Sequence, residues 1–180
     1  MRPYKIGILT VLDIFLGVVN PVQAGPVVVN DPLWYEFQFG APTGFALACT
    51  SCTPSGGGNS QFADSPAWTF TGAATLTVVD AFLSVDQFRI YDNAVLIGTT
   101  SAPTPDTSPT TSDPVVALAN LDYSRGIFGL GPGGHSITIE HIAGQSGAAY
   151  FRASVPEPTI LLLLGAGLVG LVGLRKKFKK

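Results

Sequence analysis

Charged side chains are scarce in this sequence of 180 residues, where they make up only 12% of the chain. That share is about half of what soluble domains usually carry. Glycine and proline are abundant instead, with 21 and 14 residues. This mixture favours short strands and turns over surface helices, and the length fits one domain together with targeting segments.

Positive charge is nearly absent from the middle of the chain. Between Gly25 and Ser154 the basic residues are Arg89, Arg125 and Arg152, against ten acidic residues, so this stretch has a net charge of −7. An acidic domain repels the phosphate backbone. The composition therefore argues against nucleic acid as a partner.

The amino terminus has the pattern of a secretory signal peptide over residues 1–24. Two basic residues precede an apolar run at residues 6–19, and small residues then flank a cleavage site between Ala24 and Gly25. We expect the mature chain to begin at Gly25. One acidic residue interrupts the apolar run, and a buried helix of a cytosolic fold is the alternative interpretation.

A second apolar run lies near the carboxy terminus. Thr159–Leu174 is sixteen residues long and carries no charge. As a helix it would span roughly 24 Å, slightly less than the hydrocarbon thickness of a bilayer. We predict a single transmembrane helix here, with residues 25–158 outside the inner membrane and a cytoplasmic basic tail. The basic residues of that tail are Arg175, Lys176, Lys177, Lys179 and Lys180.

The motif Val155-Pro156-Glu157-Pro158 stands directly before this run. The order of Pro-Glu-Pro, apolar helix and basic cluster over residues 155–180 resembles the PEP-CTERM sorting signal. The resemblance implies that an exosortase, a membrane enzyme, processes the chain at the surface of a Gram-negative bacterium that makes exopolysaccharide, as in a biofilm. The prolines keep the motif extended and accessible. An ordinary tail anchor with a proline-rich hinge is the alternative.

Residues 25–154 between the two signals predict an exported all-β domain. Apolar side chains recur at every second position in several short segments, which is the period of a strand. The candidate strands are 34–39, 67–70, 74–79, 87–91, 94–99, 135–142 and 148–152. Short strands separated by turn residues favour an antiparallel β-sandwich, jelly-roll-like or otherwise.

Two polar segments interrupt the strand pattern. Residues 49–65 predict a mobile loop and residues 101–112 a second loop, after which Asp113 and Pro114 predict the start of a short helix. Residues 75–158 also resemble the body of one group of PEP-CTERM proteins. That resemblance supports the predicted fold and the export to the cell surface, and it implies no enzymatic activity.

The sequence contains only two cysteines, Cys49 and Cys52. A redox C-x-x-C would open a helix beside a βαβ unit, and zinc would need two further ligands that no second cysteine pair supplies. After export we expect a local disulfide that pins the glycine-rich loop. The closed ring is small, so the expected gain in stability is modest.

Other chemistry-bearing residues form no strong pattern. His135 and His141 would share one face of a strand, but no nucleophile elbow accompanies them, and a triad with Ser124, Ser136 or Asp122 cannot be recognised without geometry. Four aspartates could supply oxygen ligands to calcium outside the cell, but no calcium-binding loop motif appears. Scattered aspartates in turns are therefore the simpler interpretation, and calcium binding is the alternative. The four aspartates are Asp80, Asp86, Asp92 and Asp122.

The G-x-G-x-x-G letters at residues 129–134 precede a predicted strand instead of a helix, so we expect a hairpin turn there and no phosphate site. No catalytic residue, cofactor or metal is assigned. The leading hypothesis is a non-enzymatic surface or matrix protein. The alternatives are a carbohydrate-binding module that stacks sugars on Trp34, Trp68 or Tyr91, and an extracellular hydrolase.

Overall fold

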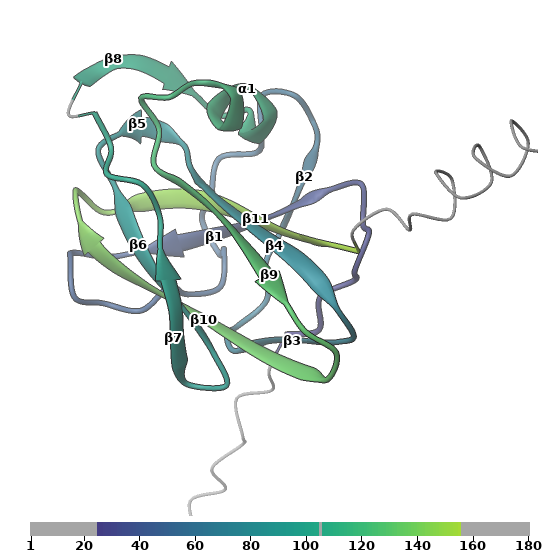
Figure 1. Ribbon diagram of the computed structural model, residues 1–180. Coiled ribbons are helices and arrows are strands. Elements are labelled where there is room, and N and C mark those ends of the chain that lie inside the picture. Colours follow the sequence, from purple (N-terminus) through teal and green to yellow (C-terminus); the bar gives the residue numbers. More distant parts are fainter. Residues whose placement is uncertain (1–24, 105, 156–180) are drawn as a thin grey trace, which may run out of the picture.

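The computed structural model describes residues 25–104 and 106–155, in which eleven strands and one short helix follow one another (Figure 1). The first half of this region contains β1 (Trp34–Phe39), β2 (Ser60–Phe62), β3 (Trp68–Thr71), β4 (Ala74–Asp80), β5 (Phe82–Ser84) and β6 (Gln87–Asp92). The second half contains β7 (Val95–Thr99), β8 (Asp106–Thr111), α1 (Pro114–Ala119), β9 (Arg125–Leu130), β10 (Gly134–Ala143) and β11 (Gly147–Ser154).

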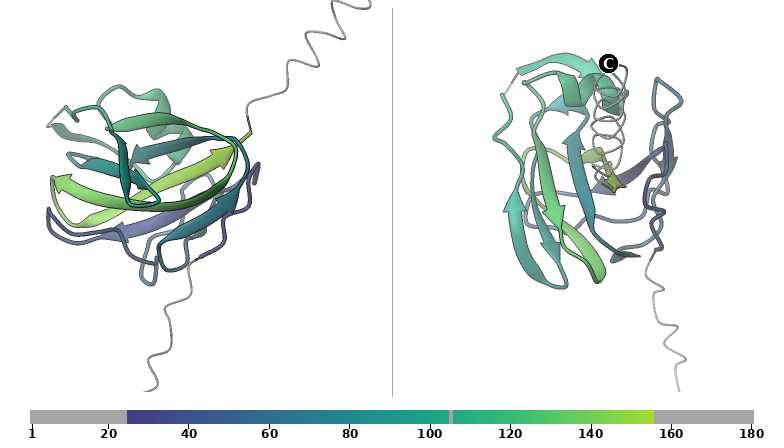
Figure 2. Two further views of the ribbon diagram at one scale, coloured as in Figure 1. Left: turned by 60° about the horizontal axis from the view of Figure 1, so that its bottom comes forward. Right: turned by 45° about the vertical axis from the view of Figure 1, so that its right-hand side comes forward.

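The strands form two large sheets that face each other, and a small third sheet (Figure 2). The five-stranded sheet has the order β2-β1-β11-β4-β9, the four-stranded sheet has the order β3-β10-β6-β7, and β5 pairs with β8. All these pairs are antiparallel except β1 and β2. The prediction of an all-β fold with mainly antiparallel strands is confirmed.

Aromatic rings fill the space between the two sheets. Tyr35, Phe37 and Phe39 point inward from β1, as the period-two pattern predicts. The ring centroid of Phe37 lies 5.7 Å from that of Phe88 on the opposite sheet, and the two rings meet edge to face. Packing of this kind adds to the hydrophobic stabilisation that burial of large rings provides.

The five-stranded sheet is also covered on its outer face. A second buried cluster there joins Trp34, Val79 and Tyr150 of the sheet to Ala117 of α1 and to Tyr123. Helix α1 begins at Pro114 with Asp113 as its N-cap, as predicted. The Asp113 carboxylate accepts hydrogen bonds from the amides of Val115 (2.8 Å) and Val116 (3.4 Å).

Several predictions about the segments between the strands are wrong. The predicted loop at residues 49–65 contains β2, and the one at residues 101–112 contains β8. Both strands are short or polar and gain their order by pairing with β1 and β5, which no local pattern reveals. Residues 131–133 join β9 of one sheet to β10 of the other, so they form no hairpin.

Both targeting predictions lie outside the described residues. These are the signal peptide at residues 1–24, with Ala24, and the segment that follows Val155, with Pro156, Glu157, Pro158, the helix at 159–174 and the basic tail. Within residues 25–104 and 106–155, no helix has the length and apolar character needed to cross a membrane.

Candidate functional site

The last described strand ends where the predicted sorting motif begins. Strand β11 closes at Ser154, and the amide of Val155 donates a hydrogen bond to Oδ1 of Asn30 (2.7 Å). The amide of Asn30 in turn donates to the carbonyl of Ala153 (3.0 Å). These bonds fasten the last described residues to the segment that follows Gly25, so the motif leaves the body from a fixed point.

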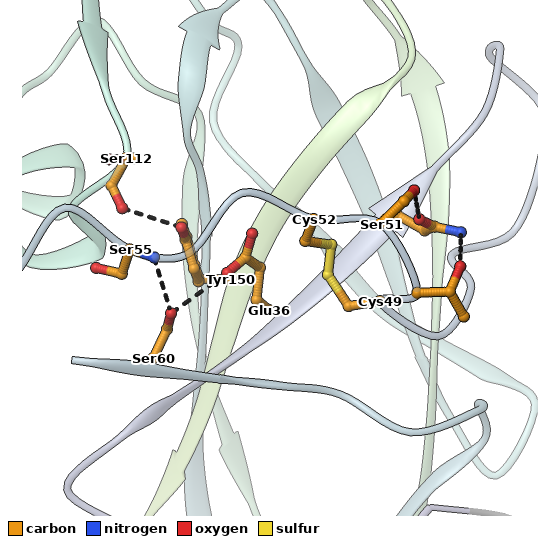
Figure 3. The surroundings of a disulfide bond; sticks show 10 residues. Glu36, Cys49, Ser51, Cys52, Ser55, Ser60, Ser112 and Tyr150 are labelled. Atoms are coloured by element: carbon orange, nitrogen blue, oxygen red, sulfur yellow. Dashed lines mark hydrogen bonds between the residues drawn. A yellow bond between two sulfur atoms is a disulfide. The ribbon is translucent and has the colours of Figure 1, made fainter. Parts of the chain in front are cut away.

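A disulfide joins Cys49 to Cys52, whose Cα atoms are 5.5 Å apart. Its loop is held against β1, because Nε2 of Gln38 donates to Oγ1 of Thr50 (3.3 Å) and Oγ of Ser51 donates to Oε1 of Gln38 (3.2 Å). Figure 3 shows the disulfide lying over this strand. The disulfide therefore constrains the backbone just before the glycine-rich segment at residues 56–58.

A groove of about 490 Å³ opens beside the disulfide, where the loop, the end of β1, the start of β11 and β5 meet. Its lining is mixed, with the amide of Gln38 and the hydroxyl of Ser146 beside the ring of Phe82. Cys52 also lines it, so the groove borders the disulfide loop. A mixed lining of this kind suits a ligand with both polar and apolar surface.

Glu36 of β1 lies beneath the disulfide and is completely buried. Burial raises the pKa of its carboxyl to about 7, although the hydroxyls of Ser60 and Tyr150 oppose the shift. Oγ of Ser60 donates to Oε2 (3.3 Å), whereas Oε1 has no hydrogen-bond partner among the described residues. Figure 3 places the Glu36 carboxyl between Tyr150 and the two cysteines.

Tyr150 of β11 completes this polar cluster on the outer face of the sheet. Its hydroxyl donates to the carbonyl of Ser112 (2.9 Å), which ties β11 to the segment before α1. Burial, followed by the charge of Glu36, raises the pKa of the Tyr150 hydroxyl above its ordinary range. Sequence reasoning missed Glu36, because strand period places it opposite the core and only the covering loop buries it.

The two histidines share the inner face of β10 with Ile137 and Ile139, as the sequence predicts. Nδ1 of His135 lies 2.8 Å from Oδ2 of Asp92 and Nε2 of His141 lies 3.1 Å from Oδ1 of Asp86, so each histidine pairs with an aspartate at one end of β6.

The remaining triad candidates are held elsewhere. Oγ of Ser124 donates to Oγ1 of Thr100, and the amide of Ser136 donates to Asp92 (3.0 Å). Asp122 follows α1, and its amide donates to Oδ1 of Asn120 (3.0 Å). The fold therefore does not assemble the triad that the sequence allows on paper.

The four aspartates considered as calcium ligands are also spread out. Asp80 and Asp86 lie close together, Asp92 is at the far end of β6 and Asp122 is in the turn after α1. Asp80 accepts hydrogen bonds from the amides of Ala81 (2.8 Å) and Asp86 (3.1 Å). Burial, with the nearby charge of Asp86, raises the pKa of Asp80 to about 9, which disfavours the charged form that a cation binds.

The aromatic residues expected to stack sugars divide into two groups. Trp34 and Trp68 are each only 1% exposed, so the prediction that either serves as a surface platform is wrong. Tyr91 lies on the outer face of the four-stranded sheet, with its ring centroid 6.1 Å from that of the exposed Phe45. The Tyr91 hydroxyl donates to Oε2 of Glu140 (2.7 Å).

Comparison with known proteins identifies one region. A family model of the PEP-CTERM protein-sorting motif matches residues 154–177. The match starts at the last residue of β11 and runs through the proline motif, the apolar run and part of the basic tail. Neither the curated proteins nor the solved structures contain a match to this chain.

Proposed function

We propose that this PEP-CTERM sorting domain-containing protein is a non-enzymatic component of the cell surface or extracellular matrix, associated with exopolysaccharide. The sorting motif marks an exported protein of a Gram-negative bacterium that an exosortase processes. The observation that carries the proposal is the position of the motif, which begins at Ser154 where the last strand ends. An enzyme reaching residues 156–158 would leave the folded body intact.

The geometry of the junction supports release of an intact domain. Val155 is 41% exposed, and its amide donates a hydrogen bond to Asn30, the last such bond along the part of the chain that the structure describes. The sequence that follows contains two prolines, a residue type that disfavours helix and favours an extended backbone at the residue before it. Cleavage after the fold has ended removes no strand from either sheet.

The proposed topology follows from the two terminal signals. Residues 1–24 direct export, and Thr159–Leu174 holds the chain in the inner membrane for a short time, with the basic tail in the cytoplasm. Residues 25–154 then face the periplasm until processing transfers them to the surface or the matrix. Placement of the charged tail supports this orientation.

A non-enzymatic role is supported by the burial of the titratable clusters. Asp80 and His141 are fully buried and Asp86 is 4% exposed, so a substrate would not reach them without local unfolding. Hydrogen bonds from backbone groups and between these side chains account for their positions. A hydrolase would require such groups in contact with a bound substrate.

A second candidate, a carbohydrate-binding module, is favoured by Tyr91 and Phe45. These rings form a partly exposed aromatic pair beside Arg89 and Glu140, whose closest charged atoms are 3.5 Å apart. Sugars stack on aromatic faces while their hydroxyls bind neighbouring polar groups. A glycan screen compares the full chain with the variant Tyr91→Ala. The control is Leu121→Ala, at an exposed site elsewhere, because it distinguishes specific binding from nonspecific hydrophobic adsorption.

Sorting is tested by replacing Pro156, Glu157 and Pro158 with alanine in the native host. The variant should accumulate in the inner membrane, because it keeps the apolar run and the basic tail but lacks the recognition element. The double variant Pro42→Ala and Pro132→Ala, at two exposed turns of the body, should sort normally. If the motif variant leaves the membrane at the wild-type rate, exosortase processing at this motif is refuted.

A further inference from the structure

The disulfide loop and β1 bring three potential metal ligands together. The ligand atoms of Glu36, Cys49 and Cys52 all lie within 4.8 Å of one another. Cys49 and Cys52 are three positions apart in one loop, whereas Glu36 lies on strand β1. The fold thus supplies a ligand that the sequence pattern alone lacks.

The free oxygen of Glu36 is an independent sign that this arrangement suits a ligand. The side chain is completely buried, yet Oε1 accepts no hydrogen bond from the described residues. Buried polar atoms nearly always have a partner, because the loss of water otherwise costs about 1–3 kcal/mol. A cation bound between Oε1 and the cysteines would satisfy this oxygen.

We propose that the dithiol form of this protein binds one zinc ion through the sulfurs of Cys49 and Cys52 and the carboxylate of Glu36. Zinc prefers thiolate and carboxylate ligands at about 2.3 and 2.0–2.2 Å in tetrahedral geometry. Ligand atoms around such an ion are separated by about 3.4–3.8 Å, which is compatible with the present spacing once the sulfurs are no longer bonded. The ion displaces one proton from each thiol.

Zinc binding and the disulfide are therefore alternative states of one site. The cytoplasm keeps cysteines reduced, so the chain enters the periplasm with two thiols. A zinc ion that arrives before oxidation holds both sulfurs as thiolates, and zinc itself does not change oxidation state. Thiol–disulfide exchange with a periplasmic disulfide donor converts the two thiols to the disulfide, and the donor is reduced to a dithiol because it takes up the two electrons and two protons. The new bond between Cys49 and Cys52 removes two ligands and excludes the ion.

The fourth coordination position of the proposed ion would lie on the side of Cys52 that borders the groove. Cys52 lines the groove of about 490 Å³, whereas Glu36 and Cys49 are buried and do not line it. Three protein ligands with one open position are typical of zinc sites that bind water or an exchangeable ligand. The bound ion would present that position to molecules entering the groove.

The test uses the full chain purified in detergent micelles, reduced with a phosphine and handled without oxygen. Titration with Zn²⁺ by calorimetry should show one equivalent bound per chain, and Co²⁺ should produce thiolate-to-cobalt charge-transfer absorption. The oxidised chain should bind neither ion. Glu36→Gln should weaken Zn²⁺ binding at least tenfold, whereas Glu140→Gln on the opposite sheet should leave the affinity unchanged.

X-ray absorption on the zinc-loaded wild-type chain tests the ligand set without any substitution. Two sulfurs and at least one oxygen around each ion are expected. Four sulfurs would mean a site shared by two chains and would overturn the proposal. It is also overturned if the reduced chain binds no zinc, or if a folded Glu36→Gln variant binds it as tightly as the wild type.

Discussion

His141 on β10 and Asp86, the residue before β6, form a buried side-chain contact, with 3.1 Å between Nε2 and Oδ1. Nδ1 of the same ring lies 2.8 Å from the carbonyl oxygen of Gly40, so both ring nitrogens face acceptors. At the other end of the same two strands, His135 faces Asp92. The two pairs fasten both ends of the β6–β10 ladder inside the sandwich.

The His135–Asp92 pair should stabilise the fold at acidic pH. Burial lowers the pKa of His135, but the Asp92 carboxylate and the carbonyls of Gly131 and Gly72 outweigh it, so the pKa is raised above 6.5. A raised pKa gives stabilisation that is complete below the unfolded value and is lost as pH rises through the folded value. His135→Gln should therefore cost about 1–2 kcal/mol near pH 5.5 and less near pH 8.5.

Urea denaturation of both proteins at the two pH values measures this difference. Ser136→Ala, on the same strand, is the control, because only its backbone amide contacts Asp92. A difference in unfolding free energy that stays constant with pH would show that His135 contributes packing and no charge.

Glu36→Gln should stabilise the oxidised protein as pH increases. The folded carboxyl has a pKa of about 7 against 4.5 in its ordinary state, so the wild type loses stability as pH rises from about 4.5 through 7. A neutral amide removes that loss, which amounts to about 1–3 kcal/mol near pH 8. Denaturation curves at pH 5 and 8 measure it.

Asp64→Asn is the matched control for this substitution. Asp64 is exposed, so its carboxylate keeps its water in the folded state. If Glu36→Gln changes stability by the same amount at both pH values, the buried carboxyl of Glu36 does not titrate between them.

Gly144→Ala should destabilise the protein by about 2 kcal/mol or more. Gly144 has a φ of +114°, and an added Cβ would overlap the Asp86 carboxylate that also binds His141. Gly131→Ala should have little effect, because nothing lies within 4 Å of the position of its Cβ. Thermal denaturation of the two variants gives the comparison, and equal midpoints would contradict the predicted clash.

The mature chain should begin at Gly25 and lack the basic tail. Gly25 is buried, and its nitrogen donates to the carbonyl of Ser65 (2.9 Å), a bond that the new amino group can keep. Mass spectrometry of surface material should find neither residues 1–24 nor residues 175–180. Recovery of the intact amino-terminal segment would contradict export by signal cleavage.

Local sequence patterns were sufficient to predict the main strands and the sorting signal. Alternation of apolar residues placed β1, β6 and β10 and oriented His135 and His141, because the side chains of a strand change face at every residue. The N-cap of α1 at Asp113 and the sorting motif are likewise recognised from short stretches of consecutive residues. Such features depend on neighbours in sequence, so the sequence by itself determined them.

The candidate sites depended on contacts between distant segments, which only the tertiary structure decided. Glu36 is buried because the disulfide loop covers the outer face of β1, and Trp34 is buried because Ala117 of α1 and Tyr123 pack in the same cluster. Strands β2 and β8 exist through pairing, since their own side chains carry no clear period. A strand pattern states which residues share a face, but burial, ion pairing and the approach of Glu36 to the two cysteines depend on what packs against that face.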